Sequence, residues 1–249
     1  MGTTNYTKFE QFKDVIFSLS LPLKKEDIVA EQFLLERLEE KNLSIYYAPV
    51  EYFNEDASIL IVGITPGFRQ MLLAYSAAIQ AKSKWNDNEK ILHQAKMASS
   101  YEGPMRKNLI RMLDELKLHE YLDIPSSAAL FGSANHFVHT TGLVPYPVFH
   151  KNKNFTGSNP SILRTDMLYN YAVEYFANDV SRLKKPIIIP LGVTVTKVLS
   201  HLANKNLLDI THMLTGFPHP SGANAHRYKQ FARNKEMMQK ELADYFRRF

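Results

Sequence analysis

The apolar positions at the start of the chain recur with the period of an α-helix. In residues 7–19, side chains such as Phe9, Phe12 and Ile16 fall on one face, which predicts an amphipathic helix. Residues 25–40 repeat this pattern, so we expect a second helix there and an N-terminal helical extension over residues 1–45. Similar spacing predicts further helices over residues 68–82, 104–118, 161–184, 193–203 and 226–248.

Continuous apolar runs predict strands that are buried on both faces. The clearest are Ser58–Gly63 and Pro186–Leu191. We expect two more strands, one at Ala128–Gly132 with an extension to His139, and a weak one at Thr211–Leu214. Strands and helices then alternate, which favours a parallel sheet covered by helices. The sequence therefore predicts one domain over residues 1–249, an α/β fold of three layers (α/β/α) with a central four-stranded parallel sheet.

Three polar segments are expected at the ends of these strands: Gly63–Gly67, His139–Gly142 and His219–Ser221. Because open parallel sheets carry their sites at the carboxyl ends of the strands, we expect the three segments to converge on one cleft. Residues 142–160 form a long loop rich in Pro, Asn and Lys, and long loops often serve a function.

The composition excludes several classes of protein. Hydrophobic residues make up 45% of the chain and charged residues 22%, which is typical of a folded globular protein. No apolar run reaches the roughly 18 residues of a membrane-spanning helix. The first residues are polar, unlike a signal peptide. We therefore expect a cytoplasmic monomer with no membrane partner.

The absence of cysteine excludes disulfides, thiolate nucleophiles and cysteine-held clusters. The nine histidines are scattered and include no His-Glu-x-x-His motif, so we expect no metal and no other cofactor. The formal net charge is +5, with a sequence pI near 9.1. This excess is compatible with nucleic-acid binding and equally with a solvated, lysine-rich surface.

Four segments are candidates for chemistry. Tyr46–Tyr52 is an aromatic segment that is compatible with simple packing, and the basic run from His226 to Arg248 suits phosphate contact or forms a solvated helix face. The turn from Gly63 to Gly67 is expected to present backbone N–H groups at a helix start, where an anion, a base edge or a water can bind. It is also compatible with an ordinary turn between strand and helix. His219, followed by Pro220, is positioned to donate to a developing negative charge, or is a solvent-facing loop histidine.

Taken together, the motifs resemble the uracil-DNA glycosylase superfamily, with the single-strand-selective monofunctional uracil-DNA glycosylases as the most similar branch. The resemblance runs from about Tyr46 to the C-terminus. It is carried by short motifs in one order: Tyr47-x-Pro49-Val50-Glu51-Tyr52, Gly63-x-x-Pro66-Gly67, Phe137-Val138-His139, Gly192-Val193 and His219-Pro220-Ser221.

The resemblance implies an enzyme that flips a base out of DNA and hydrolyses its glycosidic bond, leaving an abasic site. It implies catalytic roles for Thr65, in the water-positioning motif, and for His219, which stabilises the departing base anion. The implied base contacts are Gly63, Ile64, Pro66, Phe68, Tyr75, Asn135, His139 and Thr140, with Phe68 or Tyr75 stacking on the base. The implied DNA contacts are Gly67, Pro220, Ser221, Gly222, Asn224, His226 and Arg227.

Two positions depart from the family pattern. Thr65 stands where the family has Asn or Asp, and a hydroxyl cannot act as a carboxylate base. Thr140 and Thr141 follow His139 where relatives place the asparagine that reads uracil, and a hydroxyl reads less than an amide. Asn135 lies nearby in sequence. Both replacements are smaller, which indicates either lost catalysis or a pocket opened for a larger base.

Three hypotheses follow for the DNA partner. The first is a monofunctional glycosylase for a modified pyrimidine, with hypermodified cytosine of phage DNA, an antiviral target, as the candidate. The second is ordinary uracil excision in DNA repair. The third is a catalytically silent DNA-binding protein on the same scaffold. The sequence singles out no general base among the carboxylates Asp56, Glu102 and Asp123.

Overall fold

The computed structural model describes residues 6–247 and distinguishes two compact units within the single predicted domain. Unit 1 comprises residues up to 53 together with residues 65–100 and 145–156. Unit 2 comprises residues 54–64, 101–144 and those from 157 onward. Each unit is therefore assembled from three separate stretches of the chain. Residues 1–5 of the predicted N-terminal extension lie outside the described residues.

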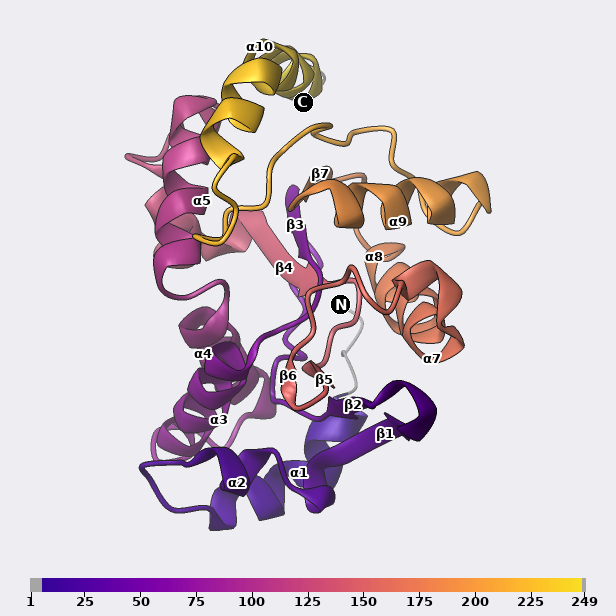
Figure 1. The fold of residues 1–249 in the computed structure, drawn as a ribbon. Coiled ribbons are helices and arrows are strands. Elements are labelled where there is room, and N and C mark those ends of the chain that lie inside the picture. The colour runs from indigo at the N-terminus through magenta and orange to yellow at the C-terminus, as the bar shows by residue number, and fades with distance from the viewer. Residues whose placement is uncertain (1–5, 248–249) are drawn as a thin grey trace. The chain divides into compact units, whose positions relative to one another are not determined.

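Unit 1 combines helices with an antiparallel sheet. The sheet has the strand order β1-β2-β5-β6. Its strands are β1 (Leu34–Leu38), β2 (Leu43–Tyr46), β5 (Val148–His150) and β6 (Lys153–Asn154). The helices are α1 (Thr7–Ser18), α2 (Lys25–Ile28), α3 (Phe68–Lys82) and α4 (Asn88–Ser99). Helices α3 and α4 run side by side in Figure 1.

Unit 2 contains a parallel sheet with the order β4-β3-β7. Its strands are β3 (Ile59–Gly63), β4 (Val138–Gly142) and β7 (Ile187–Pro190). Helices α7, α8 and α9 lie on one side of this sheet, and α5 and α10 lie on the other (Figure 1). The helices of this unit are α5 (Pro104–Glu115), α6 (Leu118–Tyr121), α7 (Asp166–Asn170), α8 (Asn178–Val180), α9 (Val193–Asn204) and α10 (Arg227–Phe246). A π-helical segment, Tyr171–Ala177, joins α7 to α8.

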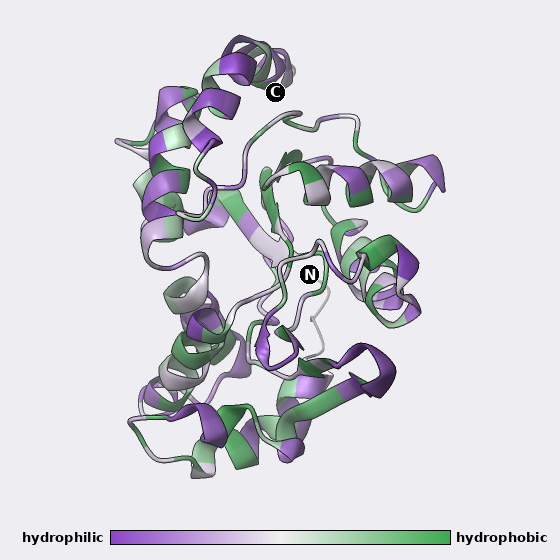
Figure 2. Cartoon of the chain, viewed as in Figure 1, coloured by the Kyte–Doolittle hydropathy of each residue, from purple (hydrophilic) through white to green (hydrophobic). Residues whose placement is uncertain are grey.

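The core of unit 2 forms around the central strand β3, whose residues are all buried. Ile59 and Ile61 pack with Leu109 and Met112 of α5 and with Phe231 of α10. Figure 2 shows β3 and β7 in the green of hydrophobic residues, whereas much of α10 is purple. Burial on both faces explains why β3 has an unbroken apolar sequence.

The structure confirms a mixed α/β class and many of the predicted elements. The expected helices over residues 7–19, 68–82 and 193–203 are α1, α3 and α9. The expected helix over 104–118 is α5, followed by the short α6, and that over 161–184 begins and ends within its predicted limits. The predicted helix over 226–248 is α10, although residue 248 lies outside the described residues. The two continuous apolar runs are β3 and β7.

The prediction for residues 25–40 was wrong. Only α2 is α-helical there, and it is followed by a 3-10 turn and then by β1. Leu34 pairs with Tyr46 and Leu38 pairs with Leu43, so cross-strand pairing with β2 overrides the helical spacing of the apolar positions. The first 45 residues are therefore not purely helical, because they contain β1 and part of β2.

The predicted strand at Ala128–Gly132 was also wrong, because Ser127–Phe131 forms a 3-10 helix. Two side chains hold its first turn: Asp114 accepts from the Ser127 amide at 2.6 Å, and Ser126 accepts from the Ala128 amide at 3.1 Å. The strand of this region is β4, which begins only at Val138.

The predicted fourth strand, Thr211–Leu214, contributes a single parallel bridge between Met213 and Ile188. Asp209 accepts hydrogen bonds from both the amide and the hydroxyl of Thr211, which turns the chain just before the bridge. The parallel sheet therefore consists of β4, β3 and β7, rather than the four strands that the sequence predicts.

Three elements were missed in regions that sequence analysis left without structure. Helix α4 is capped by Asp87, whose carboxylate accepts from the amides of Glu89 and Lys90. The long loop over residues 142–160 contains β5 and β6, which pair as a short hairpin. Within residues 6–247, no helix is long and apolar enough to cross a membrane.

Candidate active site

The three parallel strands of unit 2 end together at their carboxyl edge. Gly63 of β3 is in register with Gly142 of β4, and the pairing continues one step further. The amide of Leu143 donates to the Gly63 carbonyl and that of Val144 donates to the Ile64 carbonyl, both at 3.0 Å. The carboxyl ends of β3 and β4 therefore form one continuous edge, where sites of parallel sheets usually lie.

Tyr101, which sequence analysis did not select, packs its side chain against the last residues of β3. Its hydroxyl lies 3.1 Å from the carbonyl oxygens of both Ile61 and Thr141. A Cβ atom at position 63 would lie 3.2 Å from the Tyr101 ring, which accounts for glycine there. Burial raises the pKa of Tyr101 far above its usual range, so the phenol keeps the proton that it donates.

His219 lies at the same edge, beside the end of β7. Gly192 follows this strand with φ at +95°, and a Cβ there would approach the Cβ of His219 to 2.9 Å. The Gly192 amide donates to the carbonyl of Phe217 at 3.1 Å. Gly192 therefore supplies both the left-handed backbone and the space that bring the loop of His219 against β7.

The surroundings of His219 determine its charge and which ring nitrogen carries the proton. The ring is half-buried, and its Nδ1 accepts a hydrogen bond from the Ser221 amide at 3.3 Å. Burial lowers the pKa of His219 below its usual 6.5. The ring is therefore neutral at pH 7. Because Nδ1 is the acceptor, we assign the proton to Nε2, which makes Nε2–H a hydrogen-bond donor.

Residues 219–226, here called the His219 loop, are held by side-chain amides. Asn108 of α5 donates to the Pro220 carbonyl at 2.8 Å, and Asn224 donates to the His219 carbonyl at 3.2 Å. Gly222 and His226 are exposed on this loop. One ordered loop thus contains five of the predicted DNA contacts: Pro220, Ser221, Gly222, Asn224 and His226. Arg227 begins α10 directly after this loop.

Thr65 belongs to unit 1, where its hydroxyl donates to the carbonyl oxygen of Tyr146 at 2.5 Å. The hydroxyl proton is thereby used, and the oxygen retains only acceptor capacity. The phenol of Tyr146 in turn donates to Glu51 at 2.9 Å. Thr65 is therefore able to orient a water by accepting a hydrogen bond from it, and unable to remove a proton as a carboxylate does.

The turn after Thr65 differs from its predicted form, in which its N–H groups are open to an anion. The Gly67 amide donates to Gln70 Oε1 at 2.8 Å, and the Phe68 amide donates to Asn154 Oδ1 at 2.9 Å. Side chains thus occupy both of these donors at the start of α3. Pro66 and Phe68 remain partly exposed.

Asn154 is a residue that sequence analysis did not select individually. It lies on β6, and its Nδ2 is 3.3 Å from the position of a Cβ on Gly67. Because Oδ1 receives the Phe68 amide, the orientation of the side-chain amide is fixed, with Nδ2 as a donor beside the turn. The only sequence signal was the excess of Asn in the loop over residues 142–160.

Three predicted base contacts do not fit that role. Tyr75 is fully buried in unit 1, edge-on to Phe33, and its hydroxyl donates to the Tyr47 carbonyl, so no face of its ring is open. Asn135 precedes β4, at the end of the strand opposite to Gly142, and donates to the carbonyl of Gly132. His139 is buried within β4 near its beginning, where its Nδ1 accepts from the Asn54 amide.

Thr140 occupies the middle of β4, opposite Ile61, and is 8% exposed. The sequence places His139–Gly142 after a strand, but these residues form most of the strand itself. The error arises because the predicted extension of the strand ends at His139, whereas β4 begins at Val138 and continues to Gly142. Among the predicted contacts, Gly63 and Ile64 lie at the carboxyl edge of unit 2, as does His219. The turn in unit 1 consists of the other predicted contacts from this motif, residues 65–68.

The structure separates the three candidate carboxylates. Asp56 precedes β3 and so lies toward its amino end, and Asp123 follows α6. Glu102 follows Tyr101 directly in the sequence. Glu102 also favours the charged form of Arg106, whose pKa burial lowers. Among the described residues, no group of three or more His, Asp or Glu is arranged to hold a metal ion.

No protein-family model matches the chain. A comparison with curated proteins finds similarity to the uncharacterized protein YoxB of Bacillus subtilis (strain 168). The two are 39% identical over 243 residues, which cover 97% of this chain and 94% of YoxB. An identity of this size over nearly the whole of both chains establishes a common family. The chain therefore belongs to the family of Bacillus subtilis YoxB.

Proposed function

We propose that the chain is a monofunctional DNA glycosylase that removes a modified pyrimidine. The observation that carries the proposal is His219, a neutral imidazole with its donor at Nε2, at the carboxyl edge of a parallel sheet. A donor of this kind stabilises negative charge that develops on a departing base. The motif order that resembles the uracil-DNA glycosylase superfamily supports the same assignment.

In the proposed reaction, the bond between the sugar C1′ and the base nitrogen breaks, and its electron pair leaves with the base. His219 Nε2–H donates to the oxygen on which this charge collects. A water oxygen bonds to C1′, and the proton that the water loses compensates the base anion. The resemblance assigns the orientation of this water to Thr65, and most of the rate enhancement comes from stabilising the leaving group.

The substrate class rests on the resemblance, in which Thr65 stands where the family carries a larger Asn or Asp. A smaller side chain at that position favours a base bulkier than uracil, such as hydroxymethylcytosine or its glucosylated form. The fold that the resemblance implies has a fourth parallel strand, and the bridge between Met213 and Ile188 supports its place next to β7.

The proposed enzyme acts as a cytoplasmic monomer on DNA.

The proposal is tested by measuring base release from oligonucleotides that contain uracil, hydroxymethylcytosine or glucosylated hydroxymethylcytosine, in single and double strands. His219→Asn retains an acceptor for the Ser221 amide but lacks the Nε2 donor, and we expect it to lose about 10²–10³-fold in rate. His219→Gln restores a donor near the Nε2 position and should recover part of this loss. His136→Ala, which removes an exposed histidine from the same unit, is the matched control.

Base release from the modified pyrimidines, with loss in His219→Asn and none in His136→Ala, supports the proposal. Folded wild-type protein that leaves all these substrates intact contradicts it, as does base release that is unchanged in His219→Asn.

One set of contacts favours a second candidate, a DNA-binding protein without catalysis. The Thr65 hydroxyl donates to Tyr146, and the amides of Gly67 and Phe68 are taken by Gln70 and Asn154. A turn whose donors are occupied contributes little to holding a water or an anion. This candidate predicts salt-sensitive DNA binding with no base release.

A further inference from the structure

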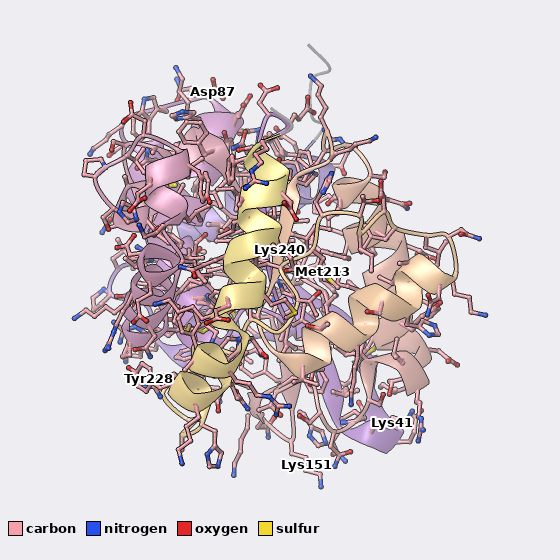
Figure 3. The ribbon with its side chains drawn as sticks, turned by 90° about the horizontal axis from the view of Figure 1, so that it is seen from above. Lys41, Asp87, Lys151, Met213, Tyr228 and Lys240 are labelled. Atoms are coloured by element: carbon pink, nitrogen blue, oxygen red, sulfur yellow. The ribbon has the colours of Figure 1, made fainter. Side chains whose placement is uncertain are left out.

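Two guanidinium groups contact one exposed tyrosine at the start of α10. The Cζ atom of Arg227 lies 4.4 Å from the centroid of the Tyr228 ring, and that of Arg111 on α5 lies 5.1 Å from it. Tyr228 is 42% exposed and lies near one end of α10, with Lys240 further along the helix (Figure 3). We call Tyr228, Arg111 and Arg227 the Tyr228 platform.

The surroundings of the platform are positively charged. Residues 227–235 of α10 contain Arg227, Lys229, Arg233 and Lys235 and no acidic residue, and the helix is largely purple in Figure 2. On α5, Lys107 precedes Arg111 by one helical turn. The carboxylate that faces the platform is Glu115, which lies 3.3 Å from Arg111 Nε and 3.8 Å from Lys235 Nζ. One carboxylate thus meets two cations.

Arg227 keeps unused donors. One terminal nitrogen donates to the Asn224 carbonyl at 3.1 Å, and the other donates to the Tyr228 hydroxyl at 3.3 Å. Each of these nitrogens carries a second N–H. In the part of the chain that the structure describes, Nε is buried without a hydrogen-bond partner, so a ligand would meet the terminal nitrogens. Both guanidinium groups lie against the same ring, and Glu115 pairs with Arg111, so Arg227 and the neighbouring lysines leave an excess of positive charge that attracts an anion.

The platform is joined to the proposed active site through the His219 loop. Arg227 bonds to the carbonyl of Asn224, and the side chain of Asn224 bonds to the carbonyl of His219. On the other side of the loop, Asn108 of α5 donates to the carbonyl of Pro220. The two helices that carry the guanidinium groups therefore also hold the two ends of the loop.

We propose that the Tyr228 platform binds a backbone phosphate of a DNA strand. Planar guanidinium groups match phosphate oxygens in charge and geometry. The row of cations along α5 and α10 favours a polyanionic strand over a single free phosphate. The inference rests on the proposed function in one respect: the strand bound here is the one that presents its base to His219.

The test is the affinity for a fluorescent single-stranded oligonucleotide of ordinary bases, measured by anisotropy at low and moderate salt. We expect Arg111→Gln and Arg227→Gln each to weaken binding about tenfold at low salt. Each should also reduce the slope of log Kd against log salt by about 1. Arg227→Lys retains the charge and should recover part of the affinity, and Lys240→Gln, further along α10, is the matched control. Circular dichroism of each variant confirms folding.

The inference is overturned if folded Arg111→Gln and Arg227→Gln bind with the affinity and salt slope of the wild type, or if Lys240→Gln weakens binding equally. It is also overturned if inorganic phosphate or polyglutamate competes as well as DNA at equal phosphate or carboxylate concentration. Base release measured in the same platform variants separates this inference from the proposed function. Platform-dependent binding without base release from any substrate would support the platform and contradict the glycosylase.

Discussion

At the scale of single residues, the most informative atom is Nδ1 of His219. By accepting the Ser221 amide it assigns the ring proton to Nε2, and burial keeps the ring neutral. A solvent-facing loop histidine, the alternative that the sequence allows, would carry no such constraint. A residue chosen for its position next to a proline is thus also oriented by its own loop.

The depressed pKa of His219 has a consequence for stability. Below pH 6.5 the unfolded chain binds a proton at this histidine more readily than the folded protein does, so the free energy of unfolding decreases as pH falls through this range. His219→Asn removes the titration. We therefore expect the free energy of unfolding, measured in urea from about pH 7.5 to about pH 5, to fall less in the variant than in the wild type. Equal or steeper loss in the variant would contradict this assignment.

The residues that sequence analysis missed share one property. Tyr101, Asn108 and Asn154 each act on a segment far away along the chain: β3 and β4, the His219 loop and the start of α3. Nothing in the local sequence of a tyrosine or an asparagine indicates such a partner. Thr65 and His219, by contrast, lie next to prolines in segments that are visible in the sequence.

At the scale of elements, Tyr101 links β3 to β4 at their carboxyl ends. Tyr101→Phe removes the hydroxyl that lies between the carbonyls of Ile61 and Thr141. We expect this substitution to lower the free energy of unfolding by about 1 kcal/mol, measured by urea denaturation.

Tyr121→Phe is the matched control for this substitution, because Tyr121 is 42% exposed and its hydroxyl loss should cost less than about 0.5 kcal/mol. If Tyr101→Phe is as stable as Tyr121→Phe, the hydroxyl contributes nothing to the edge of the sheet.

Elements were predictable where their apolar pattern matched their environment. Strand β3 is buried on both faces and α1 buries one stripe, and both were predicted close to their observed limits. Strand β1 was not, because all five of its residues lie within an apolar pattern that a helix also satisfies, and pairing with β2 decided the outcome. Residues 211–214 pair with β7 only through the bridge between Met213 and Ile188, and an Asx turn at Asp209 precedes this bridge. The hydrophobicity of these residues does not indicate that the pairing is so short.

At the scale of the whole molecule, the strands differ in how well their backbones are protected. Strand β3 is central in its sheet and fully buried, whereas β1 is an edge strand with exposed residues. We expect amides of Ile59–Val62 to exchange with deuterium far more slowly than those of Leu34–Leu38. Hydrogen exchange followed by mass spectrometry measures both peptides in one experiment, and equal or reversed rates would contradict the prediction.

The division into two units is the feature of the whole molecule that sequence patterns did not indicate. The chain changes units after residues 53, 64, 100, 144 and 156, and no run of Gly, Pro or Ser marks all these positions. The apparent motif from Gly63 to Gly67 spans one of them. Its first two residues extend β3 in unit 2, and the rest begin the turn into α3 in unit 1.

This interleaving matters for the gene as well as for the protein. No single contiguous stretch of the gene encodes either unit. A premature stop codon anywhere between codons 54 and 144 therefore removes parts of both units. Exchange of modules by recombination at a single breakpoint is equally unproductive. We therefore expect the coding sequence to be inherited and to function as one indivisible piece.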